Sequence, residues 1–96
     1  MERRRLTGDE LDNAIAGLAS WQVAEDHLTK HYKFENFAQA LEFVNRVGEL
    51  AEAADHHPDI AFGWGYARLE LMTHDRGGIT DVDIALASKI DSLKAN

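Results

Sequence analysis

The sequence predicts an α+β domain in which an antiparallel sheet of about four strands has three helices packed on one face. Two observations lead to this prediction. In three separate segments the apolar residues repeat every three or four positions, as they do along the buried side of a helix, whereas in the segments between them they alternate with polar residues. The resulting order is helix, strand, strand, helix, strand, strand, helix. We therefore expect residues 1–96 to form one domain with a single core.

The first helix is expected to begin after Thr7 and to end near residues 18–20. Thr7 and Glu10 have the spacing of a capping box, in which two side chains satisfy free backbone N–H groups of the first turn. Apolar residues then repeat on one helical face, at Leu11, Ile15 and Leu18.

Two strands are expected next, at residues 21–24 and 28–34, with Glu25-Asp26-His27 as the turn between them. The second strand alternates, with Leu28, Tyr32 and Phe34 on one side and Thr29, His31 and Lys33 on the other. One side of this hairpin is therefore expected to face the core.

The second helix is expected to run from Phe37 to about Ala54, with Asn36 as its cap. Pro58 disfavours helical geometry at the residue before it, so the helix should end just before or within the pair His56-His57. This pair is thus predicted to lie at the junction between a helix and a loop.

A loop or short strand at residues 60–62 and a longer strand at 66–73 are expected to follow, since Ala67, Leu69 and Leu71 alternate with polar residues. Gly77-Gly78 predicts a turn. The segment 80–83 has capping-box spacing at Thr80 and Asp83, and it should open the last helix, whose apolar stripe is Val82, Leu86, Ile90 and Leu93.

Composition excludes several classes of protein. The formal net charge of −7 opposes binding to nucleic acid, whose phosphates are also negative. The one dense basic run, residues 3–5, lies near a terminus, where a solvated tail is the simpler interpretation. No stretch of about 18 apolar residues is present, so a membrane-spanning segment is not expected. The chain has no cysteine, which excludes disulfides and thiolate metal sites. We expect a cytoplasmic protein that binds a small molecule.

His56 and His57 are candidates for acid–base chemistry. Asp55 and Asp59 flank the pair, and Glu52 lies one turn earlier. The negative end of the helix and these carboxylates favour the imidazolium form, and a histidine that is protonated near neutral pH can act as a general acid. On local physics alone, a pair of solvated residues that end a helix is the simpler interpretation.

A longer string changes that balance, because DHHPDIAFGWGYARLELMTHDRGGITDVD resembles the signature of the pterin-4a-carbinolamine dehydratases, known in animals as dimerisation cofactors of a homeodomain transcription factor. That signature has a histidine pair before proline, a strand that ends in Thr-His, a Gly-Gly turn and Thr-x-x-Asp at the last helix. Here His74 follows His57 by 17 positions, as the signature requires. The resemblance extends upstream through GLASW and FENFAQALEFVNRVGELAE.

The resemblance implies a 4a-hydroxytetrahydrobiopterin dehydratase, a hydro-lyase that forms quinonoid dihydropterin and water without a metal or other cofactor. It implies that His56 and His74 protonate the leaving hydroxyl and that His57 mainly holds the substrate. It also implies a functional link to an aromatic amino acid hydroxylase, whose cofactor is recycled, and a homodimer or homotetramer.

Further residues match family positions around the pocket, namely Glu52, Asp55, Thr73 and Asp83, and we expect them to bind pterin nitrogens or to orient imidazoles. Asp83 has a second interpretation as the capping partner of Thr80. The segment 64–67, Trp-Gly-Tyr-Ala, departs from the commoner Tyr-Asn-Lys/Arg-Val of the family. Trp64 could stack on a flat bicyclic ligand or serve in the core or an interface.

Two alternatives stay open at this stage. Three histidines with nearby carboxylates could bind zinc, although neighbouring helical residues point about 100° apart, which makes joint ligation by His56 and His57 awkward. Alternatively, the protein could keep the fold but act as a non-catalytic dimerising interaction or coregulator protein.

Overall fold

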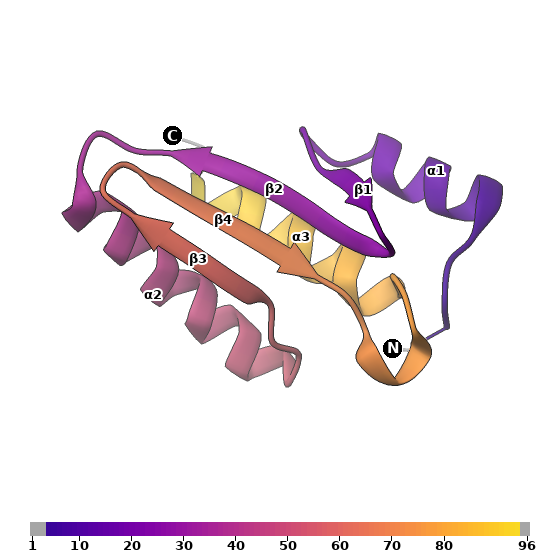
Figure 1. Cartoon of the computed structure of the whole chain (residues 1–96). Helices are drawn as coiled ribbons and strands as arrows, with labels where there is room; N and C mark the ends of the chain where they lie inside the picture. Colours follow the sequence, from indigo (N-terminus) through magenta and orange to yellow (C-terminus); the bar gives the residue numbers. More distant parts are fainter. Residues whose placement is uncertain (1–3, 95–96) are drawn as a thin grey trace.

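The computed structural model describes residues 4–94, whose four strands form one antiparallel sheet in the order β1-β2-β4-β3 (Figure 1). The elements follow the predicted order, and the α+β fold class is confirmed. They are α1 (Gly8–Ala16), β1 (Gln22–Ala24), β2 (His27–Lys33), α2 (Phe37–Ala54), β3 (Asp59–Gly63), β4 (Tyr66–Leu71), the short 3-10 helix η1 (His74–Arg76) and α3 (Asp81–Lys94).

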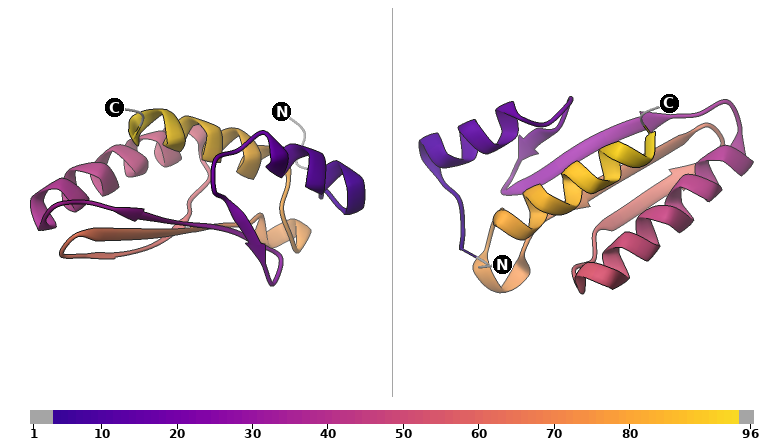
Figure 2. Two further views of the ribbon diagram at one scale, coloured as in Figure 1. Left: turned by 90° about the horizontal axis from the view of Figure 1, so that it is seen from above. Right: turned by 180° about the vertical axis from the view of Figure 1, so that it is seen from behind.

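The helices lie on one side of the sheet. Figure 2 shows α2 and α3 crossing the same face of the sheet, with α1 on that side beside β1. The core lies between the sheet and α2 and α3, where the side chains of the two central strands meet those of the helices. Its buried members include Leu28, Tyr32, Phe43, Val47, Ala67, Leu69, Leu71, Leu86 and Ile90. The alternation predicted for β2 and β4 is thus confirmed at the residues that face the helices.

Helix α2 begins and ends where the sequence predicts. At its start the side chain of Asn36 accepts a hydrogen bond from the backbone N–H of Gln39 at 2.9 Å. At its end Asp55 adopts a left-handed conformation, with φ 51°. The N–H of Asp55 bonds to the carbonyl of Glu52, and the N–H of His56 bonds to the carbonyl of Ala51 at 3.1 Å. This is the Schellman arrangement that ends helices, and it fixes the position of His56.

The prediction for α1 was wrong in two details. The side chain of Thr7 makes no capping hydrogen bond, and the Glu10 carboxylate accepts from the guanidinium of Arg4 at 2.8 Å rather than from the backbone at Thr7. That pairing also holds the pKa of Glu10 below its usual value, mainly through the hydrogen bond. The helix ends at Ala16 rather than at residues 18–20, since the chain tightens into 3-10-type bonds there, such as the one from Leu18 N–H to Ile15 O.

The first hairpin turn is shorter than predicted. Only Glu25 and Asp26 form it, and His27 already pairs with Ala24 across the ladder. Both turn residues have positive φ, 51° and 66°. This geometry matches the type of two-residue turn whose twist fits that of the flanking strands, which explains why the strands continue one residue further.

The second hairpin is longer at its start than predicted and shorter at its end. The short strand expected at residues 60–62 extends to the whole of Asp59–Gly63. The following strand ends at Leu71, because Thr73 leaves the ladder and forms an isolated bridge with Gly78. The turn predicted at Gly77-Gly78 is present, with Gly77 at φ 68°.

The basic run near the start of the chain is only partly within the described residues, since residue 3 lies outside them. Arg4 pairs with Glu10, and the guanidinium of Arg5 lies 3.3 Å from the carboxylate of Asp26. In the part of the chain that the structure describes, no helix has the length and apolar character needed to cross a membrane.

Candidate active site

His56 is buried, with 6% of its surface exposed, directly after the turn that ends α2. Its ring Nε2 lies 2.5 Å from Oδ1 of Asp83, which belongs to the first turn of α3. A carboxylate only accepts hydrogen bonds, so Nε2 carries the hydrogen and donates the hydrogen bond to Asp83. Asp83 is the one hydrogen-bond partner of the imidazole among residues 4–94, and the contact uses Nε2 rather than Nδ1.

Asp83 is fully buried, and its carboxylate bonds both to His56 after α2 and to the backbone at the start of α3. Its Oδ2 accepts hydrogen bonds from the backbone N–H of Thr80 and from the hydroxyl of Thr73, both at 2.9 Å. The hydroxyls of Thr73 and Thr80 are 2.8 Å apart. The capping position predicted for Asp83 is therefore occupied as expected, and the same carboxylate also orients His56.

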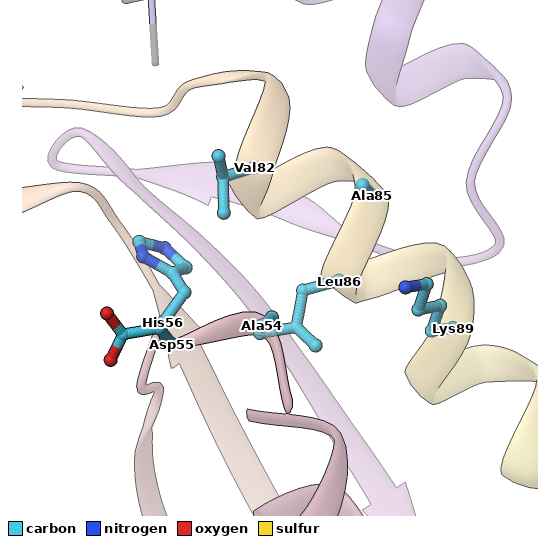
Figure 3. A pocket seen from close by; sticks show the side chains of 7 residues that line it. All are labelled: Ala54, Asp55, His56, Val82, Ala85, Leu86 and Lys89. Carbon is cyan, nitrogen blue, oxygen red and sulfur yellow. The ribbon is translucent and has the colours of Figure 1, made fainter. Parts of the chain in front are cut away.

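A cavity of about 350 Å³ opens beside His56, between the end of α2 and one face of α3 (Figure 3). This volume is at the lower end of the range typical of small-molecule sites. The lining residues are Ala54, Asp55, His56, Val82, Ala85, Leu86 and Lys89. The wall is thus largely apolar, with one imidazole, one carboxylate and one ammonium group as its polar parts.

His57 points away from the buried network. Its side chain is 56% exposed, and its ring Nε2 contacts the Oε2 of Glu52. The sequence placed Glu52 one turn before His56, but the structure pairs it with His57 instead. The two neighbouring histidines therefore have different partners, one buried carboxylate and one exposed carboxylate.

His74 is exposed and begins η1, directly after Thr73. It lies at the same end of the β3–β4 hairpin as His57, because Asp59 pairs with Glu70 across the ladder. Neither His57 nor His74 lines the cavity. Thr73, predicted as a substrate-binding residue, is fully buried in the hydrogen-bond network of Asp83.

Trp64 lies in the turn between β3 and β4 and is 73% exposed. The five residues of β3 separate it from the histidine pair, a distance of about 16 Å along an extended strand. Within one chain, the structure does not bring Trp64 to the cavity.

Sequence reasoning missed most of the α3 side of the cavity. Val82 and Leu86 were assigned to the apolar stripe of the helix, and Ala85 and Lys89 were not singled out. The spacing i, i+3, i+4, i+7 that these four residues share places them on one helical face and could have indicated that Lys89 shares their surroundings.

Among residues 4–94, no three His, Cys, Asp or Glu side chains come close enough to share a metal ion. The buried pair of His56 and Asp83 is a two-membered arrangement in which both carboxylate oxygens already accept hydrogen bonds from protein donors.

A small α+β domain with an imidazole held by a buried carboxylate at the wall of a cavity has the framework of a ligand-binding protein with acid–base capacity. The family model described as "Pterin 4 alpha carbinolamine dehydratase" matches residues 4–93, and the chain belongs to this family. The resemblance seen in the sequence is thereby confirmed.

Relatives and solved structures agree with this assignment. The chain is 48% identical over 89 residues to a Rubrobacter xylanophilus protein with the provisional name pterin-4-alpha-carbinolamine dehydratase, covering 92% of this chain and 83% of that protein. A crystal structure of a transcriptional coactivator/pterin dehydratase from Brucella melitensis superposes with a TM-score of 0.90 at 32% identity, covering 94% of this chain and 98% of that one.

A more distant structure has the same fold and a different role. It is a pterin dehydratase-like protein described as a RuBisCO assembly factor in the alpha-carboxysome. The TM-score is 0.66 at 25% identity, with coverage of 82% of this chain and 92% of that one.

Proposed function

We propose that this protein dehydrates a 4a-hydroxytetrahydropterin, with 4a-hydroxytetrahydrobiopterin as the reference substrate, to quinonoid dihydropterin and water. The observation that supports this most directly is the buried pair of His56 and Asp83 at the wall of a ligand-sized cavity, in a chain of the pterin dehydratase family. The product is the oxidised form of the cofactor that aromatic amino acid hydroxylases use, which gives the reaction a recycling role.

The reaction breaks the bond between C4a and the hydroxyl oxygen, and it needs two proton transfers. The leaving hydroxyl takes up one proton and departs as water, while a ring nitrogen loses one proton as the C=N bond forms. His56 in its imidazolium form donates through Nδ1 and remains bound to Asp83 through Nε2. The neutral imidazole can then accept the ring proton, so that the protein returns to its starting state.

The remaining site residues have supporting roles in this proposal. His74 is a second proton donor for the hydroxyl, and His57, held by Glu52, positions the substrate. The exposed carboxylate of Asp55 at the cavity accepts hydrogen bonds from the amino and N–H groups of the pterin. Asp83 acts on the reaction by orienting His56, since both of its oxygens bind protein groups.

Stopped-flow dehydration of freshly generated 4a-hydroxytetrahydropterin tests the proposal. The wild-type protein should exceed the buffer rate, and His56→Ala should lower the catalysed rate by about 10²–10⁴-fold, as expected for loss of a general acid. His74→Ala should lower it as well. His31→Ala is the matched control, because His31 is exposed on β2 and lies outside the cavity. A wild-type rate equal to that of buffer would contradict the proposal.

Metal removal separates this mechanism from the zinc alternative. Dialysis of the wild-type protein against a chelator should leave the dehydration rate unchanged. Loss of the rate, followed by recovery on addition of zinc, would show that the acid–base account is wrong.

A second candidate function is a binding role of the kind named for the two solved relatives, a coactivator and an assembly factor. The exposed apolar side chains of Phe37, Leu41 and Trp64 are consistent with a partner surface. A partner that is lost when Phe37, Leu41 or Trp64 is changed, but retained by His56→Ala and His74→Ala, would support this role over catalysis.

The proposal extends to the organisation of the protein. We propose that residues 1–96 act as one dehydratase-like domain, that the protein forms a homodimer or homotetramer, and that it works in the cytoplasm beside a hydroxylase. The absence of cysteine supports the cytoplasmic location, and the exposed apolar side chains support self-association.

A further inference from the structure

Lys89 lies at the far end of the cavity from His56. It shares one face of α3 with Val82, Ala85 and Leu86, and it is seven residues beyond Val82. At a rise of 1.5 Å per residue, the backbone of Lys89 therefore lies about 10 Å along α3 from Val82, which is at the end of the helix near His56. Figure 3 shows the side chain of Lys89 on the cavity side of α3.

No contact of Lys89 within the described residues explains why a lysine stands at this position. Its helical neighbours at three and four positions are Ala85, Leu86, Ser92 and Leu93, so none offers a carboxylate. Within residues 4–94 its ammonium has no hydrogen bond or ion pair, in contrast to Lys30, which binds Asp91 at 2.8 Å. Lys89 also precedes the last turn of α3, where a cation would stabilise the helix end.

The charges around the cavity are separated. Asp55 supplies a carboxylate at the end of α2, near His56, and Lys89 supplies the one ammonium group on the α3 side of the lining. A ligand that fits both groups has N–H donors at one end and an anion at the other. The protein as a whole carries −7, which repels anions, so an anionic group can be held only where a local cation offsets that field.

We propose that Lys89 binds an anionic group on the side chain of the pterin, so that the cavity prefers pterins with a carboxylate or phosphate substituent over pterins with a neutral one. This inference rests on the proposed function, because it takes the pterin ring to lie between His56 and Asp55. It makes Lys89 a specificity-determining residue that contacts the substituent and takes no part in the proton transfers.

Equilibrium binding to a matched pair of oxidised pterins tests the proposal. The probes are pterin-6-carboxylate and the neutral 6-hydroxymethylpterin, with the phosphate ester of the latter as a third arm that separates carboxylate from phosphate recognition. The wild-type protein should bind the better anion about three- to tenfold more tightly than the neutral pterin, the gain expected of a single partly exposed ion pair. Added salt should reduce this preference.

Variants test whether the preference for anionic pterins comes from Lys89. Lys89→Gln should remove it by weakening only the binding of the anionic probes, whereas Lys89→Arg should retain it. Lys33→Gln is the matched control, because it removes the same charge from an exposed position on β2 outside the cavity. Equal affinity of the wild-type protein for neutral and anionic probes, or a preference that survives in Lys89→Gln, would overturn the proposal.

The binding and rate measurements separate this inference from the proposed function. If both classes of pterin bind with equal affinity and dehydration is fast, only the role of Lys89 is wrong. If neither pterin binds, the cavity is not a pterin site and both proposals fail. If anionic pterins bind more tightly through Lys89 but no dehydration occurs, the specificity holds and the catalytic proposal fails.

Discussion

Asp55 adopts a left-handed backbone conformation that glycine adopts at lower cost, and glycine is the common residue at this position of a Schellman motif. Its carboxylate has no hydrogen-bond partner within residues 4–94, and it lines the cavity. A residue that costs stability without a structural contact is characteristic of a binding site. Asp55 is therefore a residue at which stability and ligand binding should change in opposite directions.

Asp55→Gly should raise the free energy of unfolding by about 0.5–1 kcal/mol, because it removes the cost of the left-handed conformation. It should also weaken pterin binding. Urea denaturation and equilibrium binding measure the two effects. Ser20→Gly is the control, since Ser20 has φ 65° but lies outside the cavity, and this change should affect stability alone. Unchanged pterin binding by Asp55→Gly would exclude a contact with the ligand.

Asp83 is the residue whose loss should affect the fold most. Asp83→Asn replaces a buried carboxylate that accepts hydrogen bonds from His56, Thr73 and Thr80 with an amide that brings its own donors. We expect the free energy of unfolding to fall by about 2 kcal/mol, measured by urea denaturation. Asp81→Asn, on the first turn of the same helix, should change it by less than about 0.5 kcal/mol. Equal effects of the two changes would contradict the assignment.

At the level of elements, α3 is attached to the sheet by a polar cluster at Asp91. The carboxylate accepts hydrogen bonds from the hydroxyl of Tyr32 at 2.6 Å, from the ammonium of Lys30 at 2.8 Å and from the indole N–H of Trp21 at 3.0 Å. Burial raises the pKa of Tyr32, and the hydrogen bond to Asp91 and the charge of Asp91 raise it further. The cluster therefore requires a neutral tyrosine.

This shift predicts a loss of stability in alkali. The folded state keeps the Tyr32 proton to a higher pH than the unfolded state does, so the contribution is fully present below about pH 10 and is lost as the pH rises above that value. Above pH 10 this one group should lower the free energy of unfolding by about 1.4 kcal/mol per pH unit. Tyr32→Phe should make the decline shallower, as measured by denaturation at pH 9–11.

The second tyrosine provides the comparison. Tyr66 is 40% exposed at the start of β4, away from Asp91. Tyr66→Phe should leave the alkaline decline as steep as in the wild-type protein. The same reduction in both variants would mean that Tyr32 is not the group responsible.

The elements that could be predicted best are those with signals at their ends. Helix α2 has Asn36 before it and Pro58 after it, and its bounds were predicted correctly. The end of α1 and the length of the first turn were predicted wrongly. The helix ends at Ala16, before Gly17, whereas the apolar stripe continues to Leu18. In the turn, left-handed Glu25 and Asp26 are not marked by glycine in the sequence.

For the site, local sequence identified the polar residues but not how they are connected. His56 and Asp83 are 27 positions apart, and only the packing of α3 against the end of α2 shows that they form a pair. Glu52 pairs with His57 rather than with His56, and this too depends on where the two histidine side chains point after the helix has ended. Lys89 was missed because its role depends on a cavity, which the order of residues does not show.

At the scale of the whole molecule, the helices cover one face of the sheet and leave the other face uncovered (Figure 2). Several large apolar side chains are exposed in the described part of the chain, among them Val23, Phe37, Leu41, Trp64 and Tyr66. For a domain of this size, self-association is an effective way to bury such surface.

We expect sedimentation velocity to show a dimer or tetramer at micromolar concentration and a shift to smaller species on dilution. The sedimentation coefficient should be the same for His56→Ala, since His56 is buried inside one chain. A monomer over the whole concentration range would contradict this expectation.

The contribution of α3 to the cavity has a consequence for how the protein is made. Four of the seven lining residues, and the carboxylate that orients His56, belong to this last helix. During synthesis the histidine pair emerges well before residues 81–94, so the growing chain contains His56 without the partner that fixes its ring. A product that ended before residue 81 would contain His56, His57 and His74 and still lack the cavity. The cavity beside His56 can therefore form only after residues 81–94 have been synthesised.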